Sequence, residues 1–146
     1  MTVKEYMTPN PVTVTPETSV PEAAALMKKG GFRRLPVLQE GELVGIVTDR
    51  DLKEAMPSDA NALSVWEINY LIARLKVAEI MTEHPVTVAD TVPLQAAAKT
   101  MLEAKVGGLP VTHEGKLVGV ITVTDVLRAF LHREAELLVG AEETKA

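Results

Sequence analysis

The sequence contains no cysteine and very few aromatic residues. None of its 146 residues is cysteine, which excludes disulfides, thiolate catalysis and any cysteine-ligated metal or iron–sulfur site. Aromatic residues make up 3% of the chain, against a hydrophobic content of 47%. We therefore expect an aliphatic core built from valine, leucine, isoleucine, alanine and methionine.

Long apolar runs and an excess of positive charge are also missing. No stretch approaches the ~18 apolar residues that a membrane span needs, and the polar N-terminus carries no signal-like apolar segment. We therefore expect a soluble, cytoplasmic protein that does not bind membranes. The net charge of −5 argues against general nucleic-acid binding, which needs a basic face. A small anionic ligand remains compatible, because a few arginines and helix N-termini suffice for one phosphate.

What the sequence does contain is one pattern that occurs twice, 74 residues apart. VKEYMTPNPVTV at 3–14 returns as VAEIMTEHPVTV at 77–88, and RLPVLQEGELVGIVTDRDL at 34–52 returns as GLPVTHEGKLVGVITVTDV at 108–126. About twenty of about fifty aligned positions are identical, without a gap. A repeat of this length is one supersecondary unit, which usually cannot bury its apolar face alone. The repetition predicts a pseudo-symmetric pair packed around a central cleft, where function should be sought.

Each repeat is predicted to fold as β-α-β-β-α, which makes the fold class α/β. In the first repeat we expect strands at 11–14, 35–38 and 43–48, a helix that opens at 18–22 and stops at 30–31, and a second helix from about 49–51. In the second we expect strands at 85–88, 109–112 and 117–122, with helices at 93–104 and about 124–139. The predicted domain boundaries are 1–53 for repeat 1, 54–76 for a linker, 77–139 for repeat 2 and 140–146 for a polar, frayed tail.

The linker is predicted to contain an amphipathic helix at 63–76, capped by Ser64. Its apolar face would consist of Leu63, Trp66, Tyr70, Leu71 and Leu75. Such a stripe usually belongs to a core, so the first interpretation is that the helix packs the repeats together. The alternative is that it forms part of a dimer surface.

Each repeat ends a buried strand with a threonine that is followed three residues later by an aspartate. The pairs are Thr48 with Asp51 and Thr122 with Asp125. Residues three apart lie on one side of a helical turn, and an ionised carboxylate offers two acceptor oxygens, which suits the 2′,3′-diol of a ribose. Unpaired N–H groups at the start of a helix favour a phosphate. The same pattern is also an acidic form of the capping box, and the two roles are compatible.

The ordered set of motifs resembles a tandem pair of CBS domains, the cystathionine-β-synthase-type regulatory repeats of Bateman-type modules. The motifs that carry the resemblance are Met7-Thr8 with 11–14, Leu35-Pro36-Val37 and 45–51, which recur at 81–88, 109–111 and 119–125. The similarity covers nearly the whole chain except the linker and tail. The segment SVWEINYLIARLKVAEIM is also similar to the CBS part of acetoin-utilisation-type regulators.

The resemblance implies up to two adenine-nucleotide sites in the central cleft, each with its ribose-phosphate half in one repeat and its adenine half in the other. Carried over by position, site one combines Val120, Thr122, Thr124 and Asp125 with Thr8, Val12, Phe32 and Arg33. Site two combines Ile46, Thr48, Arg50 and Asp51 with Thr82, Val86, Val106 and Gly107. The aspartates would hold the ribose, the threonines would reach ribose or phosphate, and the apolar residues would enclose the base.

The two predicted sites are not equivalent. Arg33 and Arg34 align with Gly107 and Gly108, so one copy loses two cations that could bind a phosphate. The alternative for these arginines is a solvated surface charge. Arg50 aligns with Thr124, which removes a third cation from the other half. One site is expected to be vacant or to prefer an uncharged adenosine derivative.

The predicted function is a non-enzymatic, regulatory module that senses an adenine nucleotide or adenosine derivative, such as AMP, ADP, ATP or an S-adenosylmethionine-like compound. Binding would change the contacts of the module with itself or with an unknown protein target. The alternatives are a structural homodimerisation module without a ligand and, less favoured, a small nucleotide-processing enzyme. The resemblance also suggests homodimers formed by repeat helices, with 21–29 and 93–104 as candidates. No metal site is predicted, because His84, His113 and His132 form no ligand-spaced pair.

Overall fold

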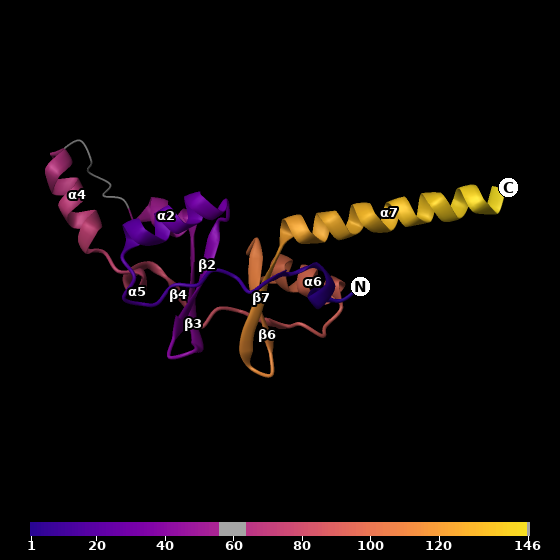
Figure 1. Ribbon diagram of the computed structural model, residues 1–146, viewed down its shortest axis with the longest axis horizontal. Helices are drawn as coiled ribbons and strands as arrows, with labels where there is room; N and C mark the ends of the chain where they lie inside the picture. The colour runs from indigo at the N-terminus through magenta and orange to yellow at the C-terminus, as the bar shows by residue number, and fades with distance from the viewer. Residues whose placement is uncertain (56–63, 146) are drawn as a thin grey trace. The chain divides into compact units, whose positions relative to one another are not determined.

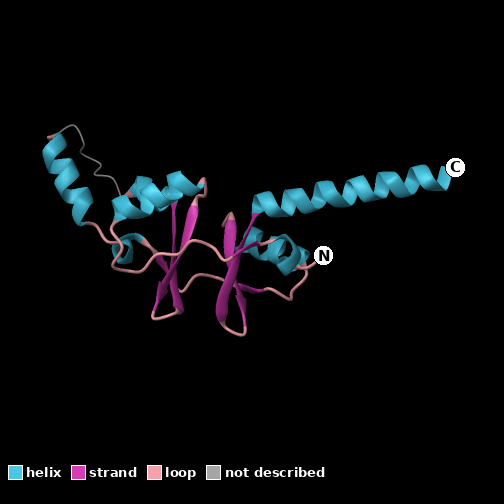
Figure 2. Cartoon of the chain, in the orientation of Figure 1, coloured by secondary structure: helices cyan, strands magenta, loops and turns pink. Residues whose placement is uncertain are grey.

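The chain forms two compact units. Each unit contains most of one sequence repeat together with the first segment of the other repeat. The computed structural model describes residues 1–55 and 64–145 (Figure 1). Unit 1 consists of Met1–Asn10 and Val86–Ala146, and unit 2 of Pro11–Pro85. Each unit combines one small sheet with helices, which confirms the predicted α/β class (Figure 2).

Unit 2 contains a three-stranded antiparallel sheet in the order β2-β3-β4. Its elements are α2 (Val20–Gly30), β2 (Arg34–Gln39), β3 (Glu42–Thr48), α3 (Asp49–Glu54), α4 (Val65–Arg74), α5 (Val77–Ile80) and β4 (Thr82–Glu83). Helix α2 begins within the predicted range 18–22, and Ser19 caps it: its hydroxyl accepts a hydrogen bond from the Glu22 amide at 3.2 Å.

Unit 1 contains a four-stranded sheet in the order β1-β7-β6-β5. Its elements are α1 (Val3–Tyr6), β1 (Thr8–Pro9), β5 (Val88–Ala89), α6 (Leu94–Ala104), β6 (Gly108–His113), β7 (Lys116–Thr122) and α7 (Val123–Lys145). The β5–β6 pair is parallel and the other two pairs are antiparallel.

The first ten residues complete the unit that is formed by the second repeat. In unit 1, Thr8 pairs with Val120 across β1 and β7. In unit 2, Thr82 pairs in the same way with Ile46 across β4 and β3. The sequence repeats and the compact units therefore have different boundaries.

Both exchanged segments are held by the aliphatic core and by a close backbone approach. Val3 and Val77 are fully buried in the cores of units 1 and 2. Gly119 lies opposite β1, where an added Cβ would stand 2.8 Å from the carbonyl oxygen of Thr8. Gly45 takes the equivalent place, 3.0 Å from the carbonyl oxygen of Thr82. Glycine at these two positions lets the exchanged strand reach the sheet.

Three predicted elements differ from the structure. The segment 11–14 is no strand, and only Val14 forms a bridge, with Val37; Pro11 has no N–H to donate. The strand expected at 85–88 is the shorter β5, Val88–Ala89. Helix α7 continues to Lys145 instead of ending near 139 before a frayed tail. A single glycine, Gly140, does not stop it, because the neighbouring residues include good helix formers.

The predicted linker helix is present, but its apolar face is exposed. Ser64 caps α4 through a 3.1 Å hydrogen bond from the Glu67 amide. Trp66 is 85% exposed and Tyr70 56%. The interpretation that the helix packs the repeats together, and the alternative of a dimer surface, both stay predictions. Leu75 is half-buried, and Leu63 lies outside the described residues.

Candidate functional site

In unit 2, the predicted ribose carboxylate lies in the first turn of the helix that follows β3. The Thr48 amide donates to Asp51 Oδ2 at 2.8 Å, and the Asp51 amide donates to Thr48 Oγ1 at 3.1 Å. These reciprocal bonds form a capping box at the start of α3. Asp51 is half-buried, and Thr48 lies at the same level of exposure.

Unit 1 repeats this arrangement with two additional hydrogen bonds. The Thr122 amide donates to Asp125 Oδ2 at 2.8 Å, and the Asp125 amide donates to Thr122 Oγ1 at 3.3 Å. The Thr122 hydroxyl also donates to Asp125 Oδ2, at 3.0 Å. Arg128 Nη1 donates to Asp125 Oδ1 at 3.0 Å. The Asp125 side chain is only 6% exposed, whereas that of Arg128 is 65% exposed.

The structure therefore confirms that both threonine–aspartate pairs cap their helices. Capping uses one carboxylate oxygen in each pair, Oδ2, and the other oxygen of Asp125 accepts from Arg128. The ribose role of both aspartates stays a prediction that this geometry permits.

Strand pairing places further predicted residues opposite the strand that leads to each aspartate. Thr8 faces Val120 two residues before Thr122 in unit 1. Thr82 faces Ile46 two residues before Thr48 in unit 2. Thr8 and Thr82 are exposed, whereas Val120 and Ile46 are buried. Each unit thus gathers one exposed strand threonine and one capped aspartate at the same end of its sheet.

Three of the residues that are predicted to enclose the adenine are exposed valines. Val12, Val86 and Val106 are between 42% and 50% exposed, so all three are available to a ligand. The carbonyl of Gly107 accepts from the Val123 amide at 3.0 Å, at the start of α7. The predicted combinations that join residues of different units stay predictions.

Phe32 and Arg33 line a groove on unit 2. The carbonyl of Arg33 accepts from the Asp49 amide at 2.8 Å, beside the start of α3. The groove is lined by Ala24, Met27, Lys28, Gly31, Phe32, Arg33, Asp49, Leu52 and Lys53. Phe32 also packs against the unit 2 core. The phosphate role of Arg33 and the base-stacking role of Phe32 stay predictions.

The other residues that are predicted to reach the phosphate lie in β2 and in the first turns of α3 and α7. Arg34 lies in β2, where it pairs with Thr48. Arg50 Nε donates to Glu54 Oε1 at 3.0 Å, and both side chains are largely exposed. An exposed pair of this kind contributes little to stability, so Arg50 can exchange Glu54 for an anionic ligand at small cost. Thr124 is exposed in the first turn of α7.

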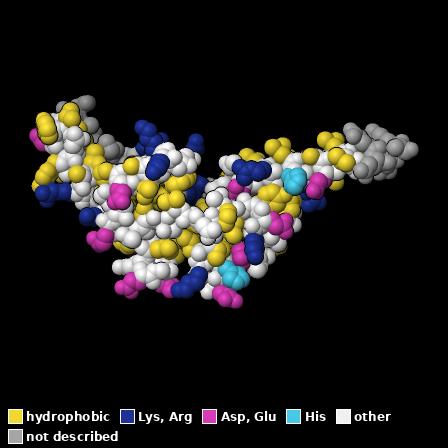
Figure 3. Space-filling view, in the orientation of Figure 1, with side chains coloured by type: hydrophobic (Ala, Val, Ile, Leu, Met, Phe, Trp, Pro, Cys, Tyr) yellow, Lys and Arg dark blue, Asp and Glu magenta, His cyan; other side chains and the backbone are white. Residues whose placement is uncertain are grey.

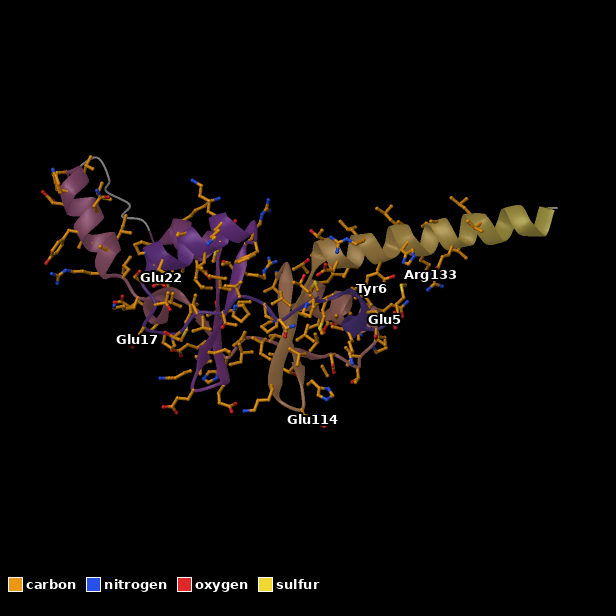
Figure 4. The ribbon with its side chains drawn as sticks, in the orientation of Figure 1. Glu5, Tyr6, Glu17, Glu22, Glu114 and Arg133 are labelled. Atoms are coloured by element: carbon orange, nitrogen blue, oxygen red, sulfur yellow. The ribbon has the colours of Figure 1, made fainter. Side chains whose placement is uncertain are left out.

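Two contacts that the sequence reasoning missed involve α7. Arg128 aligns with Glu54, and this charge reversal between the repeats is a signal from which the contact could have been predicted. Tyr6 aligns with Ile80, and its hydroxyl lies 2.9 Å from His132 Nδ1. Figure 4 shows Tyr6 directed toward α7. This contact attaches the N-terminal segment that carries Thr8 to α7.

The described residues contain no group of three metal-ligating side chains placed to hold an ion. His113 instead lies 3.1 Å from the buried Asp90, through Nδ1 and Oδ1. As for membrane insertion, no helix in the described part of the chain combines the length and hydropathy that a bilayer span requires.

Comparison with known proteins gives a family assignment. A family model described as "CBS domain" matches residues 3–58 and again residues 77–132. The chain belongs to the CBS domain family. It is a tandem CBS pair, as the repeated motifs predicted.

CBS relatives resemble nearly the whole chain. Protein MJ1225 of Methanocaldococcus jannaschii is 33% identical over 88% of the chain, which spans 46% of that relative's length. A CBS domain-containing protein of Dictyostelium discoideum is 36% identical, with 86% of the chain and 88% of the relative covered. The chain spans only 26% of an inosine-5′-monophosphate dehydrogenase of Korarchaeum cryptofilum, at 38% identity.

Solved CBS pairs share the fold of the chain. CBSX2 of Arabidopsis thaliana, in complex with AMP, has a TM-score of 0.74 at 36% identity, covering 90% of this chain and 97% of that one. The CBS pair of MJ0100, in complex with 5′-methylthioadenosine and S-adenosyl-L-methionine, has a TM-score of 0.77 at 27% identity, covering 91% and 98%. The protein AcuB of Vibrio cholerae has a TM-score of 0.74 at 30% identity, covering 98% of this chain and 96% of that one.

Proposed function

We propose that this CBS pair is a regulatory module that binds an adenine nucleotide or adenosine derivative through its threonine–aspartate pairs. The observation that carries the proposal is the capped aspartate that follows β3 and β7, each of which is a strand paired with an exposed threonine. The carboxylate is fixed by the cap, so a ribose diol would meet it without prior ordering of the side chain. The exposed threonines Thr8 and Thr82 add donors close by.

The ligand class in this proposal is supported by relatives of the same fold. CBSX2 is known in complex with AMP, and the MJ0100 pair with 5′-methylthioadenosine and S-adenosyl-L-methionine. These ligands share an adenosine ribose and differ in the charge that they carry at the 5′ position. We accordingly place the ribose on Asp51 and Asp125, and leave the 5′ group to the arginines and to the open N–H groups of the first helical turns.

The proposed output is a change in protein contacts and not a chemical reaction. Several relatives are proteins named only for their CBS domains, and the matched dehydrogenase is covered over only 26% of its length. A ligand can shift the module between two states only by binding one of them more tightly. We propose the cytoplasm as its location, although the relative CBSX2 is named as chloroplastic.

As a second candidate function, we propose that the module forms a homodimer through α7. The observation that favours it is an exposed apolar face on this helix. Five large side chains on one face of this helix are between 56% and 67% exposed: Leu127, Phe130, Leu131, Leu137 and Leu138. Their spacing places them opposite the face that packs on unit 1 through Ala129. Figure 3 shows hydrophobic side chains along α7.

Charges on α7 favour a second copy of the same helix, in antiparallel orientation, as the occupant of this face. The N-terminal half carries Arg133 and the ion pair of Arg128 with Asp125, and Glu134 and Glu136 follow them. Antiparallel pairing sets the basic half of one helix against the acidic half of its partner, whereas parallel pairing opposes like charges. This surface differs from the predicted candidates at 21–29 and 93–104.

A thermal-shift panel tests the proposed ligand. AMP, ADP, ATP, S-adenosylmethionine and 5′-methylthioadenosine are each added to the full chain, with GMP and CMP as controls for the base. A ligand present at 100 times its dissociation constant should add about 2.7 kcal/mol of stability. We expect at least one adenosine compound to raise the melting temperature and both control nucleotides to fail. If no adenosine compound raises it, the module has no ligand of this class and homodimerisation becomes the favoured function.

A further inference from the structure

The two aspartates of the proposed ribose sites differ in how many acceptor positions they still offer. A carboxylate has about four lone-pair positions, two on each oxygen. In Asp51, one of these accepts the Thr48 amide at 2.8 Å. Within the described residues no other donor is bonded to either oxygen, so about three positions stay open.

Most acceptor positions of the Asp125 carboxylate are already occupied. Its Oδ2 accepts both the amide and the hydroxyl of Thr122, at 2.8 Å and 3.0 Å. Its Oδ1 accepts Arg128 Nη1 at 3.0 Å. About one position therefore stays open, on Oδ1. The residue aligned with Arg128 is Glu54, which cannot donate to Asp51 and pairs with Arg50 instead.

The hydroxyl groups of Thr48 and Thr122 also differ in the hydrogen bonds that they form with their aspartates. The Thr122 hydroxyl donates its hydrogen to Asp125. The Thr48 hydroxyl accepts from the Asp51 amide at 3.1 Å and, among the described residues, donates to no group. Thr48 can therefore give a hydrogen bond to a ligand while Asp51 receives two.

We infer that the Asp51 site reads both hydroxyls of a ribose, whereas the Asp125 site accepts only one, and that Arg128 sets this difference. The inference rests on the proposed function, because it assumes that the aspartates bind ribose. A site with one open acceptor position takes either the 2′- or the 3′-hydroxyl and therefore tolerates the loss of one of them. A site with two or more loses a charge-assisted hydrogen bond when either hydroxyl is removed, which leaves it selective for ribose over deoxyribose.

The test compares AMP with 2′-deoxy-AMP by isothermal titration calorimetry. Asp125→Ala leaves only the Asp51 site, and Asp51→Ala leaves only the Asp125 site. At the Asp51 site we expect 2′-deoxy-AMP to bind about tenfold or more weakly than AMP. At the Asp125 site we expect a ratio below about threefold, because the 3′-hydroxyl occupies the one open position.

The role of Arg128 is tested in the Asp51→Ala variant. This test remains possible even if Asp125→Ala fails to fold. Arg128→Ala opens a second position on Asp125, so the ratio should rise to about tenfold. Arg133→Ala, which removes an arginine further along the same helix, is the matched control and should leave the ratio unchanged. Circular dichroism verifies the fold of each variant.

The outcomes separate this inference from the proposed function. If AMP binds neither the wild-type chain nor any variant, the proposed function fails. If AMP binds but the two sites show the same ratio, or Arg128→Ala leaves the ratio unchanged, only the inference is overturned. Complete loss of AMP binding in Asp51→Ala also overturns it, because Asp125 then accepts no ribose hydroxyl.

Discussion

Replacement of Gly119 by alanine is expected to destabilise unit 1 and to displace the N-terminal segment. The new Cβ would lie 2.6 Å from Met7 Sδ and 2.8 Å from the carbonyl oxygen of Thr8. The methionine side chain can move, but the Thr8 carbonyl belongs to the backbone of β1 and is held by the pairing of Thr8 with Val120. Strand β1 must therefore shift away from β7. We expect a loss of about 1–3 kcal/mol in the free energy of unfolding.

Chemical denaturation with urea measures this loss, and Gly140→Ala is its control. An added Cβ at Gly140 meets nothing within 4 Å, so alanine in this helix should stabilise by about 0.5–1 kcal/mol. Gly45→Ala should behave like Gly119→Ala, because its Cβ would lie 2.6 Å from Met81 Sδ and 3.0 Å from the Thr82 carbonyl. The close strand approach is refuted if Gly119→Ala is as stable as the unchanged protein.

Replacement of Leu131 by glutamate is expected to dissociate the proposed homodimer. Leu131 is 67% exposed in a single chain and lies in the centre of the apolar face of α7. A two-fold interface contains each substitution twice, so two unpaired carboxylates would be placed against apolar surface. The dimer should weaken by about a hundredfold or more. Light scattering coupled to size exclusion should then report 15.8 kDa, the mass of one chain, instead of twice that mass.

Trp66→Glu is the matched control for this experiment. Trp66 is 85% exposed on α4, the other helix with a large exposed apolar face, and the substitution introduces the same charge. The proposed interface predicts that Trp66→Glu remains dimeric. A monomeric Trp66→Glu with a dimeric Leu131→Glu would assign the interface to α4, and a monomeric wild-type protein would exclude both.

Local patterns predicted the longer helices and strands of each unit, but not the short elements α1, β1, α5 and β4. The turn residues Glu40 and Gly41, and Glu114 with Gly115, all have positive φ, as the short loops between β2 and β3 and between β6 and β7 require. The hydroxyl caps at Ser64 and Thr48 lie where the sequence predicted them. These features depend on a few neighbouring residues, which is why they could be read without the fold.

The exchange of segments could not be predicted from the repeat. VKEYMT and VAEIMT share the same apolar positions, so Val3 and Val77 fit the core of either unit equally well by pattern. Only the backbone pairing of Thr8 with Val120 and of Thr82 with Ile46 decides which copy each segment joins. Similarly, the amphipathic pattern predicted that α4 has an apolar face, but such a pattern does not determine what packs against that face.

The sequence predicted the features that both candidate sites share and a difference in their arginines, but not the difference between their two aspartates. Thr-x-x-Asp at the end of a strand predicts a cap, and both caps are confirmed. The distinction between the two aspartates depends on the direction of the Arg128 side chain and on the orientation of the Thr122 hydroxyl. These are rotamer choices that spacing alone does not determine.

Calorimetric titration of AMP into the wild-type chain and into the double variant Asp51→Ala/Asp125→Ala tests the central claim most directly. Each aspartate is proposed to accept charge-assisted hydrogen bonds from a ribose, and such bonds contribute about 1.5–3 kcal/mol each. We predict that AMP binds the wild-type chain and that both substitutions together weaken binding at least about tenfold at either site. Circular dichroism and urea denaturation should show that the double variant remains folded. Unchanged AMP affinity in a folded double variant would contradict the assignment of the threonine–aspartate pairs as ribose sites.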